Sequence, residues 1–421
     1  MEKSYISKNG IPIYTYKNPH QHGFFISLFL RAGSMYEEAG ECGITHFLEH
    51  AIIRNVNRVM DEGLYPLLDK YGIEFNASTF SEMVQIYVSG ATKNFKHGAN
   101  IISKTLLPLA LTGEDLKAER DRIKAEIRES DEASSLASFA SKIVNEGTSL
   151  SRPILGTLGG VSKITLRRLE EYRRRVFTPE NMFFYVTGNF ADSDIESLSL
   201  LVSGASINRG DERRNEAPVS EKFGKRGGQI HIKNGEGMIV RFNFDLDVSA
   251  LGMPVTDLLY DALLTGYNSD FFIEMSEKRG LFYDLSGSVE RYKNIGTLSF
   301  SYEVRSDALY EAVDLTLDIL KRMREELMRE DGCMKAGYVD NAMMLYDDAR
   351  ELNFTMAYDN HIMNNAYASL KERAERYRAV TARDIRDAAR RIFTRDNLTL
   401  TVKGNKKKID KEKLATLVGK L

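Results

Sequence analysis

The chain has 421 residues, 43% of them hydrophobic and 28% charged, a composition typical of a globular protein with two domains of about 200 residues. Its formal net charge of −2 gives no basis for nucleic-acid binding, and no run of 18 uninterrupted apolar residues predicts a membrane span. Two cysteines make no disulfide framework, and the first five residues (MEKSY) begin no signal-peptide pattern, so we expect a cytoplasmic location.

Strands and helices alternate from the first apolar segment onward. Residues 22–31 (HGFFISLFLR) are apolar and aromatic and predict a strand. Residues 45–56 predict a helix with Thr45 as a candidate N-cap, and residues 73–88 predict a hairpin. Two further helices are predicted over residues 94–111 and 114–130, the second with two acids in its first turn.

The second half of the chain repeats the first. The segment FTPENM…VTGN at 177–189 recurs as FTRDNL…VKGN at 393–405, a shift of 216 residues, and Thr165 maps onto Thr381. Each copy predicts a helix, a short turn and a buried strand that ends at Gly-Asn. A second trace, at a shift of 211, pairs Thr45 with Thr256.

This repeat predicts an α+β fold made of two homologous α/β sandwich domains, each a mixed sheet packed by helices and related by internal duplication. We expect an N-terminal domain over residues 1–208 and a C-terminal domain over 229–421. Residues 209–228 are polar and end in two glycines, the composition of an interdomain linker.

The pentapeptide HFLEH at 46–50 is the most informative feature of the chain. His46 and His50 stand four apart, so a helix places them on one face, where both imidazoles can bind a single Zn²⁺ beside Glu49. The order H-x-x-E-H is the inverzincin signature of zinc peptidases. With only seven histidines in the chain, a chance match is rare but not negligible.

At the shift of 211 the C-terminal copy keeps the scaffold of this helix and lacks the imidazoles. We therefore expect the N-terminal half to do the chemistry and the other half to shape the site. The residues that face His46, Glu49 and His50 are Asp257, Tyr260 and Asp261.

A catalytic zinc site keeps three protein ligands and one open position, so a third ligand is expected. Glu119 and Glu126 stand seven apart on the predicted helix 114–130, two turns along one face. From the residues alone either of them could be the ligand, and both could equally belong to a solvated surface helix.

The sequence resembles the pitrilysin-type zinc metallopeptidases, which include insulin-degrading enzyme and mitochondrial processing peptidase, and most of all their short, two-domain bacterial members. Its segment E-R-x-x-x-x-x-E at 119–126 resembles the family pattern, with the last glutamate 76 positions after His50. The resemblance implies one Zn²⁺ per chain bound by His46, His50 and Glu126. It further implies that Glu49 is the general base and Glu119 an outer-shell carboxylate.

Two more segments carry the resemblance. Residues 72–79 (GIEFNAST) resemble the family's G-x-x-x-N-A-x-T, which borders the cleft where substrate is held as an added strand, so Asn76 and Ala77 are expected to bind substrate. On composition alone Asn76 would be a turn residue. Residues 275–283 (MSEKRGLFY) resemble L-R-E-K-R-G-L-A-Y, which implies that Tyr283 binds substrate and the oxyanion.

The chain departs from the family at Ser276, where an arginine is usual. Serine cannot supply the forked cationic donor. Either Arg279 replaces that arginine, or a sister subunit of a heterodimer supplies it. A second departure, AIIRN at 51–55 for the usual M-x-F-K-G, is expected to change local packing and not the metal site.

The function implied is zinc-dependent endopeptidase activity on peptides or on unfolded or leader segments, in a homodimer or heterodimer. Zinc would activate water, Glu49 would move its proton, and Tyr283 would share the oxyanion charge. The alternative is a zinc-binding scaffold subunit that holds peptides with little activity of its own.

Overall fold

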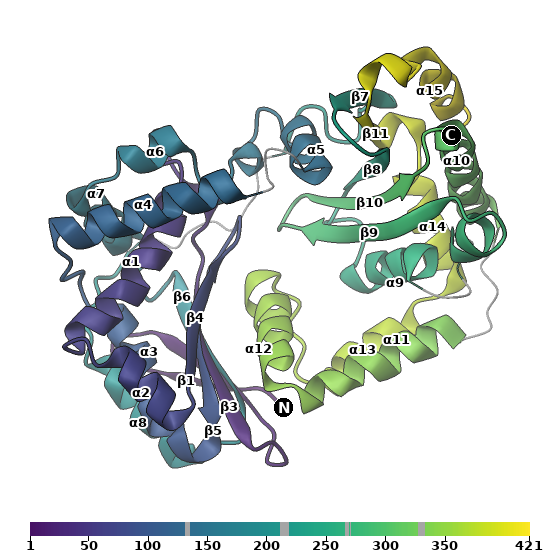
Figure 1. Ribbon diagram of the computed structural model, residues 1–421. Helices are drawn as coiled ribbons and strands as arrows, with labels where there is room; N and C mark the ends of the chain where they lie inside the picture. Colours follow the sequence, from purple (N-terminus) through teal and green to yellow (C-terminus); the bar gives the residue numbers. More distant parts are fainter. Residues whose placement is uncertain (131–134, 211–218, 266–268, 270, 327–332) are drawn as a thin grey trace. The chain divides into compact units, whose positions relative to one another are not determined.

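The computed structural model describes residues 1–130, 135–210, 219–265, 269, 271–326 and 333–421, with the backbone alone at 283 and 333–335 (Figure 1). The chain forms two compact units, each with its own sheet and helices. Unit 1 comprises residues 1–130, 152–215 and 343–372, and unit 2 comprises residues 131–151, 216–342 and 373–421. No described helix is long and apolar enough to cross a membrane.

Unit 1 is built on a mixed six-stranded sheet in the order β1-β2-β6-β3-β5-β4. Its central strands are covered on both faces, which explains why β3 and β6 are apolar almost throughout. The strands are β1 (Lys3–Ile6), β2 (Pro12–Lys17), β3 (Gly23–Leu30), β4 (Glu74–Thr79), β5 (Val84–Ala91) and β6 (Met182–Gly188).

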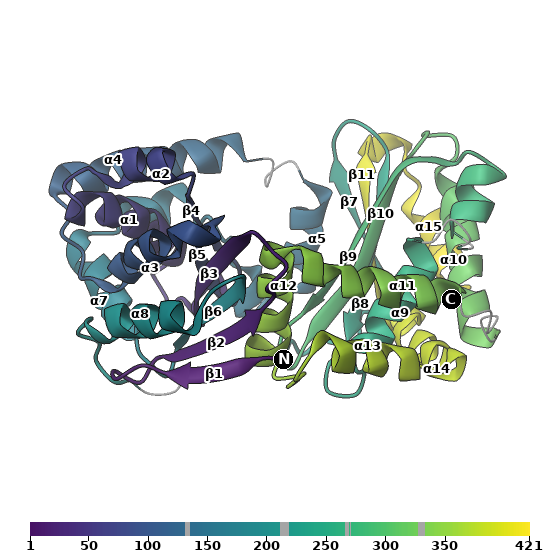
Figure 2. The same cartoon turned by 90° about the horizontal axis from the view of Figure 1, so that it is seen from below.

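Most helices of unit 1 lie on one face of this sheet (Figure 2). Their apolar side chains form the main core with it. These helices are α1 (Ile44–Val59), α2 (Leu64–Tyr71), α3 (Phe95–Ser103), α4 (Gly113–Glu129), α6 (Leu158–Ser162), α7 (Leu166–Val176) and α8 (Asp192–Ser203). The opposite face carries Tyr16, Phe29, Phe183 and Tyr185, which pack against α12 (Ala349–Ala357).

Unit 2 has a five-stranded sheet in the order β7-β11-β8-β10-β9, with strands β7 (Gln229–Asn234), β8 (Ile239–Leu246), β9 (Phe282–Arg291), β10 (Gly296–Val304) and β11 (Leu398–Gly404). Its helices are α5 (Leu136–Val144), α9 (Met253–Leu264), α10 (Leu309–Glu325), α14 (Ala382–Ile392) and α15 (Lys411–Val418). Two helices span unit boundaries, α11 (Cys333–Met343) and α13 (Leu370–Ala379).

Short helical turns complete the described elements. The 3₁₀ turns are Ser34–Tyr36, Thr92–Asn94, Lys104–Leu106, Ser149–Ser151, Met344–Asp347, Arg395–Asn397 and Lys406–Lys408. The π-helical turns are Phe272–Glu277 and Tyr358–Ile362.

The predicted duplication is confirmed in the topology. Strands β2, β6, β3, β5 and β4 of unit 1 correspond to β7, β11, β8, β10 and β9 of unit 2, with the same parallel and antiparallel pairings. The repeated segments that begin at Thr165 and Thr381 have matching structures, since Thr165 caps α7 and Thr381 caps α14. The α+β, two-sandwich fold expected from the sequence is therefore correct.

Each half of the chain lends one helix to the other unit. α5 comes from the first half but packs on β8 and β11 of unit 2, and α12 comes from the second half but packs on β3 and β6 of unit 1. The two helices are equivalent, because they are offset by 213 residues (349 − 136 and 357 − 144) and their target strands correspond. The duplicated units exchange equivalent helices.

The division predicted from the sequence, into residues 1–208 and 229–421, is contiguous. Because of this exchange, each compact unit instead combines segments from both halves of the chain. Part of the predicted linker 209–228 is packed against unit 2. Residues 211–218 lie outside the described part, but Arg226 is buried and forms an ion pair with Asp245 at 2.8 Å, both side chains being 2% exposed. The end of this polar segment is thus packed into unit 2, because the guanidinium of Arg226 pairs there with the buried carboxylate of Asp245.

One helix prediction was too long. The helix expected over residues 94–111 ends at Ser103, passes through a 3₁₀ turn to Leu106 and is extended from Leu107. Pro108 explains the end, because proline disfavours a helical conformation in the residue before it. The hairpin at 73–88 and the helix at 114–130 are confirmed as β4–β5 and α4.

Candidate metal centre

α1 carries the HFLEH segment and begins one residue earlier than predicted. Its N-cap is Gly43, and the amides of Gly43 and Thr45 both donate to the buried carboxylate of Glu37 at 3.0 Å. Thr45 is not the cap, because its hydroxyl lies in the core, 2.7 Å from the Tyr172 hydroxyl. A carboxylate at a helix N-terminus satisfies amides that have no partner within the helix.

The three residues assigned as ligands by resemblance lie together. His46 Nε2 is 3.7 Å from Glu126 Oε1, and His50 Nε2 is 3.5 Å from Glu126 Oε2. One ligand atom from each of the three residues lies within 4.8 Å of the others. Four ligands about 2.1 Å from a zinc ion stand about 3.4 Å apart, so these spacings suit atoms that share one tetrahedral ion.

The protonation of His46 also suits a metal ligand. The side chain is almost fully buried, and burial, followed by the nearby charge of His50, lowers its pKa to about 4. The imidazole is therefore neutral at physiological pH and has a lone pair to donate. The buried Nδ1 of His46 has no hydrogen-bond partner among the described residues. The side chain of Glu126 is 44% exposed, so the group of three ligands is accessible to solvent on the side of Glu126.

Glu49 lies on the same helix and is 8% exposed. Thr79, the last residue of β4, donates its hydroxyl to Glu49 Oε2 at 2.5 Å and so orients the carboxylate. Burial raises the pKa of Glu49 above its usual value, and the Thr79 hydrogen bond offsets part of that rise. A carboxylate with a raised pKa is a stronger proton acceptor.

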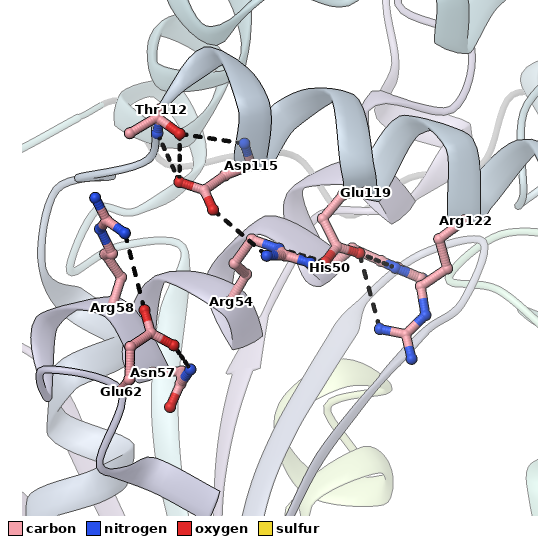
Figure 3. A network of polar contacts seen from close by, with 9 residues as sticks. All are labelled: His50, Arg54, Asn57, Arg58, Glu62, Thr112, Asp115, Glu119 and Arg122. Carbon is pink, nitrogen blue, oxygen red and sulfur yellow. Dashed lines mark hydrogen bonds and ion pairs between the residues drawn. The ribbon is translucent and has the colours of Figure 1, made fainter.

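Glu119 lies two turns before Glu126 on α4 and contacts the second histidine (Figure 3). Its Oε2 is 3.1 Å from His50 Nδ1, and its Oε1 accepts from Arg54 Nε at 2.5 Å. Burial would raise the pKa of Glu119, but the bonds from His50 and Arg54 and the charge of Arg54 lower it overall. A carboxylate on Nδ1 leaves Nε2 of the same ring free to bind a metal.

Two contributors were missed by the sequence reasoning, Thr79 and Arg54. Arg54 lies in the segment 51–55, which was expected to change local packing and not the metal site, yet it contacts Glu119, the partner of His50. Arg54 continues the i, i+4 series of His46 and His50 along α1, so helical periodicity could have indicated it. Thr79 is the last fixed position of the G-x-x-x-N-A-x-T pattern at 72–79, so that pattern could have indicated it, although its contact with Glu49 depends on how β4 packs against α1.

Asn76 and Ala77 lie in β4, the last strand of the sheet, so Asn76 is a strand residue and not a turn residue. Ala77 is buried, and Asn76 is exposed and paired with Tyr87 of β5. Because side chains alternate along a strand, Asn76 points to the face opposite to that of Thr79. Among the described residues no strand pairs with the outer edge of β4.

The remaining predicted residues belong to unit 2. Arg279 donates to the carbonyl and the carboxylate of Glu274 and is 41% exposed. Ser276 lies in the π-helical turn that precedes β9, and Tyr283 lies in β9 with its side chain outside the described part.

The positions in unit 2 that correspond to the metal motif hold a polar network instead. Asp257, which faces His46 in the repeat, accepts from Arg291 and from the Tyr377 hydroxyl. Asp261, which faces His50, accepts from the Thr265 hydroxyl. Among the described residues only the N-terminal copy brings three metal-binding side chains together.

Comparison with known proteins agrees with this geometry. A family model described as Insulinase (Peptidase family M16) matches residues 13–158, and one described as Peptidase M16 inactive domain matches residues 163–332. An uncharacterized zinc protease of Mycobacterium tuberculosis is 22% identical over 401 residues, covering 92% of this chain and 89% of that protein. Another, from Bacillus subtilis, is 24% identical over 409 residues, covering 94% and 97%.

Solved structures share the fold. A protease from Helicobacter pylori superposes with a TM-score of 0.80 at 14% identity, covering 96% of this chain and 99% of that chain. The first half of the periplasmic protease PqqL from Escherichia coli gives 0.80 at 17% identity, covering 100% and 96%. The chain therefore belongs to the insulinase family, peptidase family M16, whose short bacterial members are two-domain zinc proteases.

Proposed function

We propose that this protein is a zinc-dependent endopeptidase whose single zinc ion is bound by His46, His50 and Glu126. One observation carries the proposal: the three ligand atoms converge from two helices beside the buried carboxylate of Glu49. Zinc bound there would lower the pKa of a coordinated water towards about 7 and polarise the scissile carbonyl.

The protein side chains supply proton transfer and orientation. Glu49 takes the proton of the attacking water and then delivers it to the leaving amine. The hydroxyl of Thr79 keeps this carboxylate in one orientation through its 2.5 Å hydrogen bond. Glu119 accepts from His50 Nδ1 and so holds the ring with Nε2 towards Glu126.

We propose that the substrate is a peptide or an unfolded or leader segment that adds as a strand to β4, near Asn76 and Ala77. No described strand pairs with the outer edge of β4, which supports this mode, because main-chain hydrogen bonds to an added strand depend little on the side chains of the substrate. Tyr283 is proposed to share the oxyanion charge and Arg279 to contact substrate. Tyr283→Phe and Arg279→Met should each lower kcat/KM. An unchanged kcat/KM in either variant would contradict the role proposed for that residue.

A dimer is also proposed, either of identical chains or with a sister subunit that supplies the arginine missing at Ser276. The mass of the assembled complex from its native source tests this directly. The small number of cysteines supports a cytoplasmic location, which fractionation of the native source would check.

The decisive test is Glu49→Gln. The variant keeps the shape of the side chain and loses the base, so it should retain one zinc ion per chain and lose at least about a hundredfold in kcat for peptide cleavage. Zinc content by metal analysis and cleavage of an unfolded peptide should be measured on the same preparation.

Glu126→Gln should lose zinc, whereas Glu129→Gln, one turn further along α4 and exposed, should keep both zinc and turnover. Full activity in Glu49→Gln would contradict the assignment of the base. Wild-type protein that binds zinc but cleaves no peptide, with or without its native partner, would instead identify a peptide-holding scaffold.

A further inference from the structure

A chain of polar contacts runs along α1 and the first half of α4 and ends at His50. Its members are Asp115, Arg54, Glu119 and His50, all in unit 1 (Figure 3). Arg54 Nε donates to Glu119 Oε1 at 2.5 Å, and Arg54 Nη1 donates to Asp115 Oδ1 at 3.4 Å. The guanidinium thus joins two carboxylates of the same helix.

Glu119 depends on this contact for its orientation. Its side chain is 4% exposed, and each of its oxygens has a nitrogen partner, Oε2 at His50 and Oε1 at Arg54. Among the described residues one further cation forms an ion pair with it: Arg122 is 4.0 Å from Oε2, too far for a hydrogen bond, and is 73% exposed and so largely solvated. Without Arg54, Oε1 would have no charged partner in the described part of the chain, and the carboxylate could rotate away from His50.

Arg54 is itself held in place. Asp115 is the N3 residue of α4, and its Oδ2 accepts from the amide and hydroxyl of Thr112 at 2.9 and 2.8 Å in a capping box. That arrangement positions Oδ1 for Arg54. The orientation of the guanidinium is therefore set by the end of a helix and not by a mobile surface partner.

We infer that Arg54 is a positioning residue of the metal centre, which holds Glu119 in the orientation that accepts from His50 Nδ1 and so presents Nε2 to the ion. This inference rests on the proposed zinc site. Planar, two-pronged recognition is a property of arginine that lysine lacks, because an ammonium acts as a point charge. Arg54 thus acts on the ligand through one intermediate carboxylate.

The test is the zinc dissociation constant of the full-length protein, measured by competition with a chromogenic chelator. Loss of an outer-shell partner weakens metal binding about ten- to a hundredfold, so Arg54→Met should raise the Kd for zinc about tenfold. Arg122→Met removes the other nearby cation and Arg58→Met removes a cation one turn along α1 that pairs with Glu62. Both controls should stay within about twofold of the wild-type Kd.

A double variant separates positioning from a purely structural role. If Arg54 acts through Glu119, Arg54→Met should not weaken zinc binding further in a Glu119→Gln background. Additive losses would overturn the inference. So would a wild-type Kd in Arg54→Met, even with a lower thermal midpoint of the zinc-free protein, since that result would show that Arg54 only joins α1 to α4.

If Arg54→Met does not fold, Arg54→Lys decides, because lysine keeps the charge but cannot contact Asp115 and Glu119 as a fork. An intermediate Kd supports the inference, and a wild-type Kd overturns it. Wild-type protein with no measurable zinc affinity would overturn the proposed zinc site and this inference together. Normal wild-type affinity with an unaffected Arg54→Met would overturn the inference alone.

Discussion

At the scale of single residues, a buried carboxylate away from the metal centre, Glu82, makes the stability of unit 1 depend on pH. Glu82, in the turn between β4 and β5, is 4% exposed. Its Oε1 accepts from the Tyr358 hydroxyl at 2.7 Å, and its buried Oε2 has no hydrogen-bond partner among the described residues. Burial raises the pKa of Glu82 to about 7 despite that hydrogen bond.

The sign of the effect follows from proton binding. Between pH 4.5 and 7 the folded protein retains a proton on Glu82 that the unfolded chain releases, so the free energy of unfolding falls as pH rises through this range. The loss is about 3 kcal/mol, at about 1.4 kcal/mol per pKa unit. Glu82→Gln keeps an acceptor for Tyr358 and has no proton to lose.

Urea unfolding at pH 5 and pH 8, in the presence of a metal chelator, measures this effect. The stability of Glu82→Gln relative to wild type should increase by about 3 kcal/mol between the two values. Glu114→Gln, an exposed position in the first turn of α4, should follow the wild-type profile. Parallel profiles for wild type and Glu82→Gln would show that Glu82 is ionised in the folded protein.

At the scale of elements, the conformation at the start of α1 fixes the position of the helix that carries His46 and His50. Gly43 has φ of 88°, a left-handed conformation, and a Cβ built on it would lie 2.9 Å from the Cα of Gly156. Both the conformation and the close backbone approach require glycine. The position just before α1 therefore tolerates only glycine without strain.

Gly43→Ala should lower the free energy of unfolding by about 1–3 kcal/mol, because backbone strain and the close contact add. The matched control is Gly159→Ala in α6, where an added Cβ meets nothing within 4 Å. Chemical denaturation of the metal-free variants provides the comparison. Equal stability of the two alanine variants would mean that the Gly43–Gly156 approach relaxes at no cost.

At the scale of the whole molecule, the exchange of α5 and α12 makes each unit depend on both halves of the chain. Without α12, the sheet of unit 1 would expose an aromatic face that includes Phe29 and Tyr185. It would also lose Asn353, which accepts from the Ser27 hydroxyl and donates to the carbonyl of Tyr185 within that face. Large apolar faces of this kind favour aggregation when uncovered.

We therefore expect the isolated fragments 1–208 and 229–421 to be poorly folded alone and to assemble when co-expressed. A peptide spanning residues 343–372 should raise the thermal midpoint of fragment 1–208, because it restores α12, whereas a peptide spanning residues 131–151 should not. Fragment 1–208 that is monomeric and cooperative without the peptide would contradict the dependence.

The sequence by itself determined the features that depend on neighbours along the chain. Helical spacing places His46 and His50 on one face and Glu119 and Glu126 on another. The internal repeat identified two homologous domains and aligned Thr165 with Thr381, and the structure shows that these two threonines cap α7 and α14. These follow from local periodicity, capping and turn chemistry, which act within a few residues.

Only the tertiary structure decided which of these local faces meet. It brought α4 against α1, so that Glu126 reaches both imidazoles, and it brought Thr79 of β4 to Glu49. It also packed α5 into unit 2 and α12 into unit 1. Arg226 is buried although it belongs to a segment with the composition of a linker. The reason is physical: such contacts join residues distant in sequence, and which of them form depends on the packing of the whole core.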